Sequence, residues 1–347
     1  RLNSGIVAQN YRNRAGSACS LKDKNLHSPG RLVILHPVKH DCMVIPPYLN
    51  PGDCVGITCP ASKITPEAAR FAADVIRSWG YDVVLGETVG TAYHNFSAPD
   101  EVRLRDLQMM LDDPSIKAIL FGRGGYGMIR ILDQLRFDKF LQSPKWICGY
   151  SDITALHMHV HTHYQVPTLH SMMCSGITQE TREDRYVQSL KQAWTGIPGY
   201  YSFDVHPLNK TGYAEGVLIG GNLSLLANLS GTRSQPDSRG KILFIEDVGE
   251  YKYHIDRMMY QLRRAGWLNG LAALLVGAFT DIKDTITPFG MSVYEIIYQH
   301  VKDEIFPVAF GFPVGHQKEN YALKIGCKYA LTMEENNCVL KEIVSAA

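Results

Sequence analysis

Short apolar runs that alternate with helical patterns predict an α/β fold for this chain of 347 residues. Strands separated by helices in this way imply a parallel sheet covered by helices on both faces. The chain is long enough for two hydrophobic cores, and a polar, weakly periodic stretch divides the pattern at residues 175–212. We therefore expect a Rossmann-like or flavodoxin-like N-terminal domain with a parallel sheet, followed by a smaller C-terminal α/β domain.

The domain boundaries are predicted where the pattern changes. We expect an N-terminal extension at 1–42, a first domain at 43–174, a linker with one helical piece at 175–212, and a second domain at 213–347. The extension holds seven Lys/Arg and two Asp and shows no sustained periodicity. We expect it to be poorly ordered and interpret it as upstream or artefactual sequence before a natural start at Met43, with a transit peptide as the alternative.

In the first domain, each predicted strand is followed by a turn or a helix start. Strands are expected at 54–59, 82–86, 116–121 and 146–148. Helices are expected from Pro66 to about Trp79 with Thr65 as N-cap, from near Ser97, and at 128–135.

The second domain repeats the alternation. Strands are expected at 214–219, 241–245 and 271–279, and two short strands close the chain after His316. Helices are expected from Leu223 to about Gly231 and across 251–264, where Ile255, Met258, Met259 and Leu262 share one side.

Charge and hydropathy exclude two classes of partner. Because the extension is basic, the remaining 43–347 carry a small net negative charge and no basic patch typical of a nucleic-acid-binding protein. No apolar run approaches the length of a membrane span. We therefore expect neither a nucleic acid nor a membrane as partner.

The eight cysteines are scattered, with no CxxC pair among them. Several lie in apolar runs, as Cys59 and Cys148 do, so buried free thiols in a reducing cytoplasm are expected in place of disulfides. These spacings do not favour a structural zinc site.

Ser151 lies at the most informative position in the sequence. An apolar run, KWICG, ends in Tyr150-Ser151-Asp152, and a helical pattern begins at once. A serine at such a strand-to-helix turn has the geometry of a nucleophile in hydrolases. The alternative is a plain helix N-cap, since Ser and Asp are preferred there and Ile153 stands where the nucleophile turn usually has its second glycine.

The glycine-rich run 122–127 (GRGGYG) also follows a predicted strand. In parallel sheets, ligand sites lie at the carboxyl ends of strands, so this turn and Ser151 belong to the same edge. Its N–H groups can stabilise an oxyanion beside Ser151. A phosphate-binding turn and a tight turn without function are the alternatives.

A serine nucleophile requires a base that a third group orients. His157, His159, His161 and His163 alternate along one predicted helix, so they spread around it and form no metal site. His316 follows Gly315 at a predicted strand-to-loop exit, where functional residues concentrate, although an ordinary loop histidine is the alternative.

Among the acids, Glu246 follows the apolar strand ILFI directly. Its carboxylate can accept a hydrogen bond from an imidazole Nδ1–H and so hold the tautomer that a base requires. Asp247 can instead cap the following segment, and Glu250 can be a solvated acid at a helix start.

From Met43 to about residue 345 the chain resembles the LD-carboxypeptidase family of serine peptidases, which includes the microcin C immunity peptidases. The resemblance rests on five motifs in order: 122–127 (GRGGYG), 148–155 (CGYSDITA), 220–223 (GGNL), 245–250 (IEDVGE) with 255–257 (IDR), and Gly315-His316. The extension has no counterpart in the family.

The resemblance implies a site in the cleft between an N-terminal domain that carries the serine and a C-terminal domain that carries the Glu and His. It implies that Ser151 is the nucleophile, His316 the general base and Glu246 the acid that orients it. The backbone N–H groups of Gly125 and Asp152 are implied to form the oxyanion hole. Neither a metal nor an organic cofactor is implied.

The implied reaction is hydrolysis of an amide between an L-configured centre and a terminal D-amino acid. For this family the usual case is removal of D-alanine from murein tetrapeptides during cytoplasmic peptidoglycan recycling, by an enzyme that commonly forms homodimers. A substrate with a free carboxylate needs a cationic or N–H-rich pocket, for which Arg257 is one candidate.

One departure and two alternatives remain open in the sequence. Residues 170–173 (HSMM) differ from the His/Ser-Gly-Pro-Met of many relatives, which leaves the leaving-group pocket less defined. A microcin-type peptidase acting on an aminoacyl or peptidyl nucleotide would use an aromatic stacking residue, for which Trp194 and Trp267 are the tryptophans outside the first domain. A non-catalytic anion or nucleotide binder would use residues 122–127 and 220–222 as anion cradles and would leave Ser151 with no histidine near it.

Overall fold

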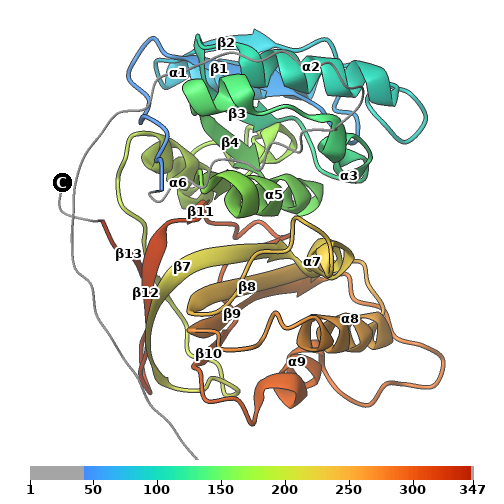
Figure 1. Cartoon of the computed structure of the whole chain (residues 1–347), viewed down its shortest axis with the longest axis vertical. Helices are drawn as coiled ribbons and strands as arrows, with labels where there is room; N and C mark the ends of the chain where they lie inside the picture. Colours follow the sequence, from blue (N-terminus) through green and yellow to red (C-terminus); the bar gives the residue numbers. More distant parts are fainter. Residues whose placement is uncertain (1–42, 345–347) are drawn as a thin grey trace, which may run out of the picture. The chain divides into compact units, whose positions relative to one another are not determined.

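The computed structural model describes residues 43–344, and their strands form a six-stranded and a seven-stranded sheet (Figure 1). Both sheets belong to one compact unit of the chain. The predicted extension at 1–42 lies outside the described residues. Within the described part, no helix has the length and apolarity to span a lipid bilayer.

The first sheet is parallel except at one edge. Its strand order is β11-β5-β4-β3-β1-β2, and β11 pairs antiparallel with β5. The order 2-1-3-4-5 of the five parallel strands is that of flavodoxin-like folds, so the predicted fold class is confirmed. The strands are β1 (Cys54–Thr58), β2 (Asp82–Leu85), β3 (Ile116–Phe121), β4 (Trp146–Gly149), β5 (Thr168–His170) and β11 (Leu323–Ile325).

Helices flank this sheet. α1 begins as predicted, because the Thr65 side chain accepts a hydrogen bond from the N–H of Ala68 and Pro66 occupies the first turn. α3 ends after one turn and continues as a 3-10 turn to Gln134, so the helix expected at 128–135 is only partly formed. The helices are α1 (Pro66–Ser78), α2 (Asp100–Asp112), α3 (Met128–Ile131), α4 (Asp138–Gln142), α5 (Thr154–Tyr164) and α6 (Arg185–Trp194).

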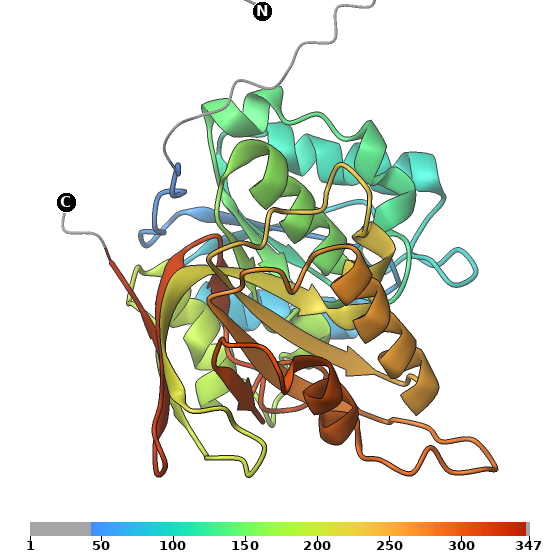
Figure 2. The ribbon, with the colours of Figure 1, turned by 60° about the horizontal axis from the view of Figure 1, so that its bottom comes forward.

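The second sheet is mixed. Its order is β10-β9-β8-β7-β12-β13-β6; β7 to β10 run parallel, and β12, β13 and β6 join them antiparallel. The strands are β6 (Tyr200–Phe203), β7 (Gly212–Asn222), β8 (Lys241–Val248), β9 (Ala273–Thr280), β10 (Val308–Phe310), β12 (Lys328–Met333) and β13 (Cys338–Glu342). The helices α7 (Leu223–Leu229), α8 (Lys252–Arg264) and α9 (Val293–Val301) lie together beside β8 to β10 (Figure 2).

Helix α5 connects the two sheets. It follows β4 of the first sheet and contacts both β5 and the β7–α7 unit of the second (Figure 1). One hydrophobic cluster accordingly runs from Ile153 and Leu156 to Leu218 and Phe244. The residues that follow β4 are therefore held by both halves of the molecule.

The chain crosses between the sheets more than once. The stretch 175–212 contains α6 and also β6, which pairs with β13 at the edge of the second sheet. Near the C-terminus, β11 returns to the edge of the first sheet. The division into 43–174, 175–212 and 213–347 stays a proposal about domain organisation.

Candidate active site

Ser151 lies at a sharp turn between β4 and α5. Its φ is +64°, a left-handed conformation that is uncommon for a residue with a Cβ and that occurs at functional turns. Ser151 opens a 3-10 turn, Ser151–Ile153, and the N-cap residue of α5 is Ile153. Ser151 is therefore not the N-cap of this helix, and its side chain is available for another contact.

The turn tolerates isoleucine at position 153 because that side chain faces inward. Ile153 is fully buried. A Cβ on Gly149 would lie 2.9 Å from Phe121 Cδ2 and 3.1 Å from Ile153 Cγ1, so glycine at 149 leaves room for both side chains. The turn usually has a glycine on each side of the serine; here Gly149 alone lets the neighbouring side chains pack close to the backbone.

His316 reaches Ser151 from the second sheet. Its Nε2 lies 2.9 Å from the Ser151 Oγ, and its Nδ1 lies 2.7 Å from Glu246 Oε2. Because a carboxylate can only accept, Nδ1–H donates to Glu246, and Nε2 is left to accept the proton of the serine hydroxyl. The structure thus brings together the three side chains that the sequence singled out.

Two features of the second sheet aim Glu246 and His316 at each other. The pairing of β8 with β9 shifts register between Ile245 and Asp247, a bulge that redirects the Glu246 side chain. Gly315 has a φ of +121°, and a Cβ there would lie 2.8 Å from Glu246 Cβ. Only glycine allows the loop to pass this close to the acid.

The electrostatics suit a base. Burial lowers the pKa of His316, but the hydrogen bond and the negative charge of Glu246 outweigh it, so the pKa is raised above the ordinary 6.5. Glu246 is itself fully buried, and its Oε1 has no hydrogen-bond partner among the described residues. A positive charge that develops on the His316 imidazole therefore lies next to the buried Glu246 carboxylate.

The glycine-rich loop lies directly against the serine. A Cβ on Gly124 would lie 2.8 Å from Ser151 Cβ and 2.9 Å from its Oγ. Gly125 follows with a φ of +100°, and its missing side chain leaves space that Ser62 occupies. The two turns predicted to share one edge of the sheet do lie together.

Asp152 ties these two turns to each other. Its Oδ2 accepts a hydrogen bond from the backbone N–H of Met128 at 2.6 Å, immediately after the glycine-rich loop. Burial raises the pKa of Asp152 to about 6, against the opposing effects of the Met128 N–H and the Arg103 guanidinium. The side chain therefore positions the loop, while the backbone N–H of Asp152 follows Ser151 directly in the chain.

Three neighbours of His316 were not singled out as site residues from the sequence. The ring of Tyr150 packs on His316 with centroids 4.9 Å apart. Asn320 Oδ1 accepts hydrogen bonds from Gly315 N–H at 3.0 Å and from His170 Nε2–H at 2.9 Å, and so links the histidine loop to β5. The unusual HSMM run was the available signal for His170, but no sequence pattern relates it to Asn320.

The second glycine turn, at residues 220–222, is filled by protein atoms. Thr154 Oγ1 accepts the N–H of Asn222 at 3.0 Å, and a Cβ on Gly221 would collide with Thr154. Asp247 accepts from Asn222 Nδ2 at 2.8 Å and from Ser224 N–H at 3.0 Å. The turn joins the sheets, which argues against its use as an anion cradle.

Asp247 is a buried acid in that joint. Burial and the neighbouring charge of Glu246 raise the pKa of Asp247 to about 7, despite its hydrogen bonds to Val248 N–H and Asn222. Its carboxylate accepts from Val248 within β8 and from Ser224 at the start of α7, whereas α8, the helix that follows, has no side-chain cap. The alternative that Asp247 caps the following segment is therefore wrong.

The remaining candidates lie elsewhere. His254 on α8 bonds to Glu250, which precedes that helix, at 2.9 Å, and Arg257 stacks over Tyr253 at 5.3 Å from the ring centre. Trp194 and Trp267 are fully buried, so neither ring is available to stack on a nucleobase. Among residues 43–344, no group of three or more His, Cys, Asp or Glu side chains is arranged to hold a metal ion.

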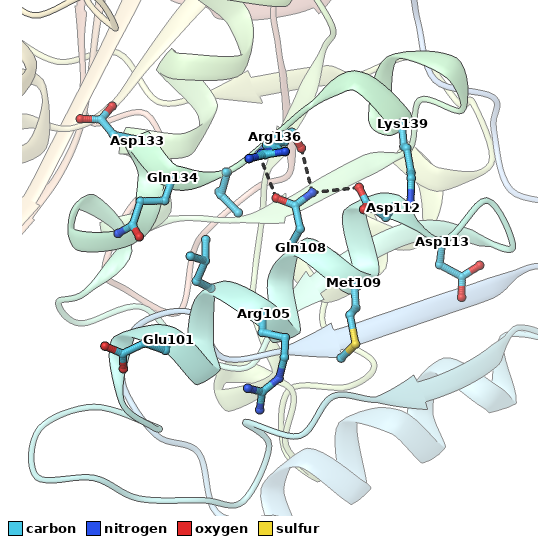
Figure 3. Close-up of a pocket in the computed structure, with 12 residues that line it drawn as sticks. Glu101, Arg105, Gln108, Met109, Asp112, Asp113, Asp133, Gln134, Arg136 and Lys139 are labelled. Carbon is cyan, nitrogen blue, oxygen red and sulfur yellow. Dashed lines mark hydrogen bonds and ion pairs between the residues drawn. The ribbon is translucent and has the colours of Figure 1, made fainter.

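A groove of about 980 Å³ lies apart from Ser151, His316 and Glu246. It lies between α2 and residues 133–139 and is lined by charged side chains of both signs (Figure 3). Gln108 crosses it and bonds to the backbone of Arg136 and to Asp112, so its walls are held together by polar contacts. None of Ser151, His316 and Glu246 borders it.

Comparison with known proteins agrees with this architecture. Residues 55–171 match the LD-carboxypeptidase N-terminal domain and residues 215–331 match the LD-carboxypeptidase C-terminal domain. A probable murein peptide carboxypeptidase of Bacillus subtilis is 35% identical over 303 residues, which cover 86% of this chain and 95% of that protein.

Solved structures show the same arrangement. The muramoyltetrapeptide carboxypeptidase from Oxalobacter formigenes superposes with a TM-score of 0.76 at 28% identity, covering 85% of this chain and 100% of the other. The microcin C7 self immunity protein MccF, solved with glutamyl sulfamoyl guanosine, superposes with a TM-score of 0.76 at 22% identity, over 86% and 98% of the two chains. The likeness to MccF extends to the fold alone.

Proposed function

Because this chain belongs to the LD-carboxypeptidase family, we propose that it is a serine carboxypeptidase that hydrolyses an L,D amide bond and releases a terminal D-alanine from a murein tetrapeptide. The observation that carries the proposal is the continuous hydrogen-bonded series Ser151 Oγ, His316 Nε2, His316 Nδ1 and Glu246 Oε2, at 2.9 and 2.7 Å. It combines a nucleophile, a base and an orienting acid within contact distance before any substrate is bound.

The proposed reaction has two stages. Ser151 Oγ attacks the carbonyl carbon of the scissile amide while His316 Nε2 takes the hydroxyl proton, and the imidazolium then gives that proton to the leaving amine. A water attacks the resulting ester in the second stage, with His316 again as base, and the serine hydroxyl is regenerated. Glu246 holds the Nδ1–H tautomer throughout and stabilises the positive charge on the ring.

The backbone N–H groups of Gly125 and Asp152 are proposed as the oxyanion hole. Their support is position: Gly124 touches Ser151, Gly125 follows it in a conformation open to glycine, and Asp152 is the residue after the nucleophile. The hydrogen bond from Met128 N–H to the Asp152 carboxylate holds these two turns in register, so that both donors are positioned in advance.

The physiological setting is proposed from the relatives. Proteins named as murein peptide and muramoyltetrapeptide carboxypeptidases support a murein tetrapeptide as substrate. We extend this to cytoplasmic peptidoglycan recycling by a homodimer. A nucleotide substrate of the microcin type is less favoured, because both tryptophans outside the first 174 residues are buried.

The test is release of free D-alanine from a murein tetrapeptide by the purified protein beside its Ser151→Ala variant. We expect release by the wild type and a loss of about 10⁴-fold or more in the variant, because the nucleophile is removed. Release by both proteins at similar rates would exclude Ser151 as nucleophile. Release by neither would contradict the proposed substrate, and an aminoacyl nucleotide would then be assayed in the same pair.

A further inference from the structure

A pocket of about 420 Å³ lies beside the glycine-rich loop. Its walls come from the segments that follow β1, β2, β3 and β5, at the same edge of the first sheet as Ser151. Its polar lining residues are Lys63, Thr65, Thr91, Arg123 and Ser175, and the apolar ones include Ile64, Pro66, Ala68 and Ala92.

The pocket is cationic. Its described lining holds Lys63 and Arg123 but no carboxylate. Among the ion pairs of residues 43–344, none involves either cation, and the Lys63 ammonium has only the carbonyl oxygen of His94 at 3.5 Å. Two positive charges thus face one pocket without a negative partner in the described part of the chain.

The pocket is connected to the nucleophile through backbone contacts. The N–H of Ser62, next to Lys63, donates to Gly124 O at 3.0 Å, and Gly124 lies against Ser151 Oγ. The N–H of Ser175 donates to Gly122 O at 3.0 Å. Arg123 therefore extends from a loop whose one side touches the catalytic serine and whose other side forms the pocket wall.

The charge of Arg123 also acts on Tyr150, the residue before Ser151. Burial and the negative charge of Glu246 raise the pKa of Tyr150 to about 12, and Arg123 opposes this increase. The guanidinium is thus electrostatically coupled to the turn that holds Ser151.

We propose that Lys63 and Arg123 bind the free carboxylate of the residue that leaves, so that this pocket makes the enzyme a carboxypeptidase. The inference rests on the proposed function and names the group that the same site recognises. In the substrate, only the amide nitrogen and one α-carbon separate that carboxylate from the scissile carbonyl carbon. Its receptor must therefore lie close to Ser151, and Arg123 is the residue next to Gly124, which lies against the Ser151 Oγ.

The chemistry of the two cations suits this role. A guanidinium can form two parallel hydrogen bonds with a carboxylate. A peptide that is amidated, or that continues past this residue, offers no anion and leaves the two cations unpaired. Arg257, the candidate from sequence, instead lies on α8 in a groove with Tyr260 and Arg264.

The experiment compares a murein tetrapeptide ending in D-alanine with its C-terminal amide. We expect wild type to prefer the free acid, and Arg123→Gln to lower kcat/KM for the acid about ten- to hundredfold while reducing the acid-to-amide ratio by a similar factor. Arg123→Lys should restore part of the preference, and Lys63→Gln should show a smaller loss because its ammonium is less constrained. Arg257→Gln is the matched control and should keep the wild-type ratio.

A ratio that is unchanged in Arg123→Gln, or a loss of equal size on both peptides, would overturn the inference while leaving the proposed function intact. A binding measurement distinguishes a failure of this inference from a failure of the proposed function. In the Ser151→Ala background, the affinity for the acid over the amide should depend on Arg123 whether or not wild type hydrolyses the peptide. If wild type does not hydrolyse it but this dependence is found, the pocket stands and the proposed reaction fails; if neither is found, both fail.

Discussion

Ser151 combines an unfavourable backbone conformation with a functional contact. A non-glycine residue at a φ of +64° costs free energy, and surrounding structure must hold it there. The buried Ile153 on one side and Gly124 on the other supply that constraint. In this conformation the Ser151 hydroxyl points at His316, which reaches it from the second sheet.

The contact between His316 and Glu246 predicts how Glu246→Gln changes the pH dependence of kcat/KM. Because His316 must be neutral to accept a proton, and its pKa lies above 6.5, the acid limb of kcat/KM in wild type should lie above pH 6.5. Without the carboxylate, burial is the main influence on the pKa of His316 and lowers it. The acid limb should therefore move to lower pH. The rate at pH 8 should fall roughly 10³- to 10⁴-fold, because the tautomer is no longer held.

The measurement is kcat/KM for D-alanine release between pH 5 and pH 9 in both proteins. Glu250→Gln serves as control, since Glu250 bonds to His254 on α8 and should leave the limb in place. An acid limb that stays in position in Glu246→Gln would contradict the role assigned to this acid.

The same residues show what the sequence can reveal about a site. Ser151, Glu246 and His316 each follow a predicted strand, so local pattern and family motifs were sufficient to single them out. Asn320 and His170 were not found, because their contact joins positions 150 residues apart and depends on how two sheets meet. Arg123 was visible as part of the glycine-rich motif, but its separation from any acid was not.

Among the elements, the β7–α7 turn and the start of α5 form the joint that holds the site together. Thr154 begins α5, three residues after Ser151, and its Oγ1 accepts the N–H of Asn222 inside the core. Glycine at 221 lets the two backbones approach. This hydrogen bond ties the helix that follows Ser151 to β7 of the second sheet.

We predict that Thr154→Val weakens this joint. The change keeps the shape of the side chain but leaves the buried N–H of Asn222 without its acceptor, which should cost about 1–3 kcal/mol of the free energy of unfolding. Urea unfolding monitored by circular dichroism measures the change. Thr162→Val on the same helix is the control: its hydroxyl only donates to Ser234 O from a half-buried position, so a smaller loss is expected. Equal losses in both variants would refute a special role for the joint.

Element boundaries show the limits of local signals. α1 begins at the predicted Thr65-Pro66 signal, because N-capping is satisfied within one turn. α2 begins three residues after the predicted start near Ser97, because the Ser97 hydroxyl instead donates to the buried Cys59 carbonyl at 2.6 Å. The Ser97 hydroxyl is thus engaged in a tertiary contact, and α2 begins after Pro99 without a side-chain cap.

For the whole molecule, the C-terminal part links the two sheets a second time. Lys324 on β11 of the first sheet places its ammonium 3.0 Å from both carboxylate oxygens of Glu342 on β13 of the second sheet. Both side chains are buried, at 2% and 4% exposure. Glu342 also accepts the N–H of Gly199 at 2.8 Å, which satisfies a further donor.

We predict that Lys324→Met destabilises the protein by about 3–5 kcal/mol, because it leaves the Glu342 carboxylate buried and unpaired. The double variant with Glu342→Gln should recover part of this loss, since an amide oxygen can still accept from Gly199 N–H without carrying a charge. Chemical denaturation of the wild type, both single variants and the double variant forms the cycle that measures it. No recovery in the double variant would show that the loss comes from packing and not from the unpaired charge.

The sequence by itself determined the fold class and the identity of the proposed triad, because strand and helix periodicity and the residues at strand ends are local properties. It also placed the glycine-rich loop at the edge of the sheet that holds Ser151. Only the tertiary structure decided that β11 returns to the first sheet, that residues 220–222 join the two sheets, and that Lys63 and Arg123 share one pocket. These features depend on contacts between distant segments, whose free energies come from burial and charge pairing that no local pattern records.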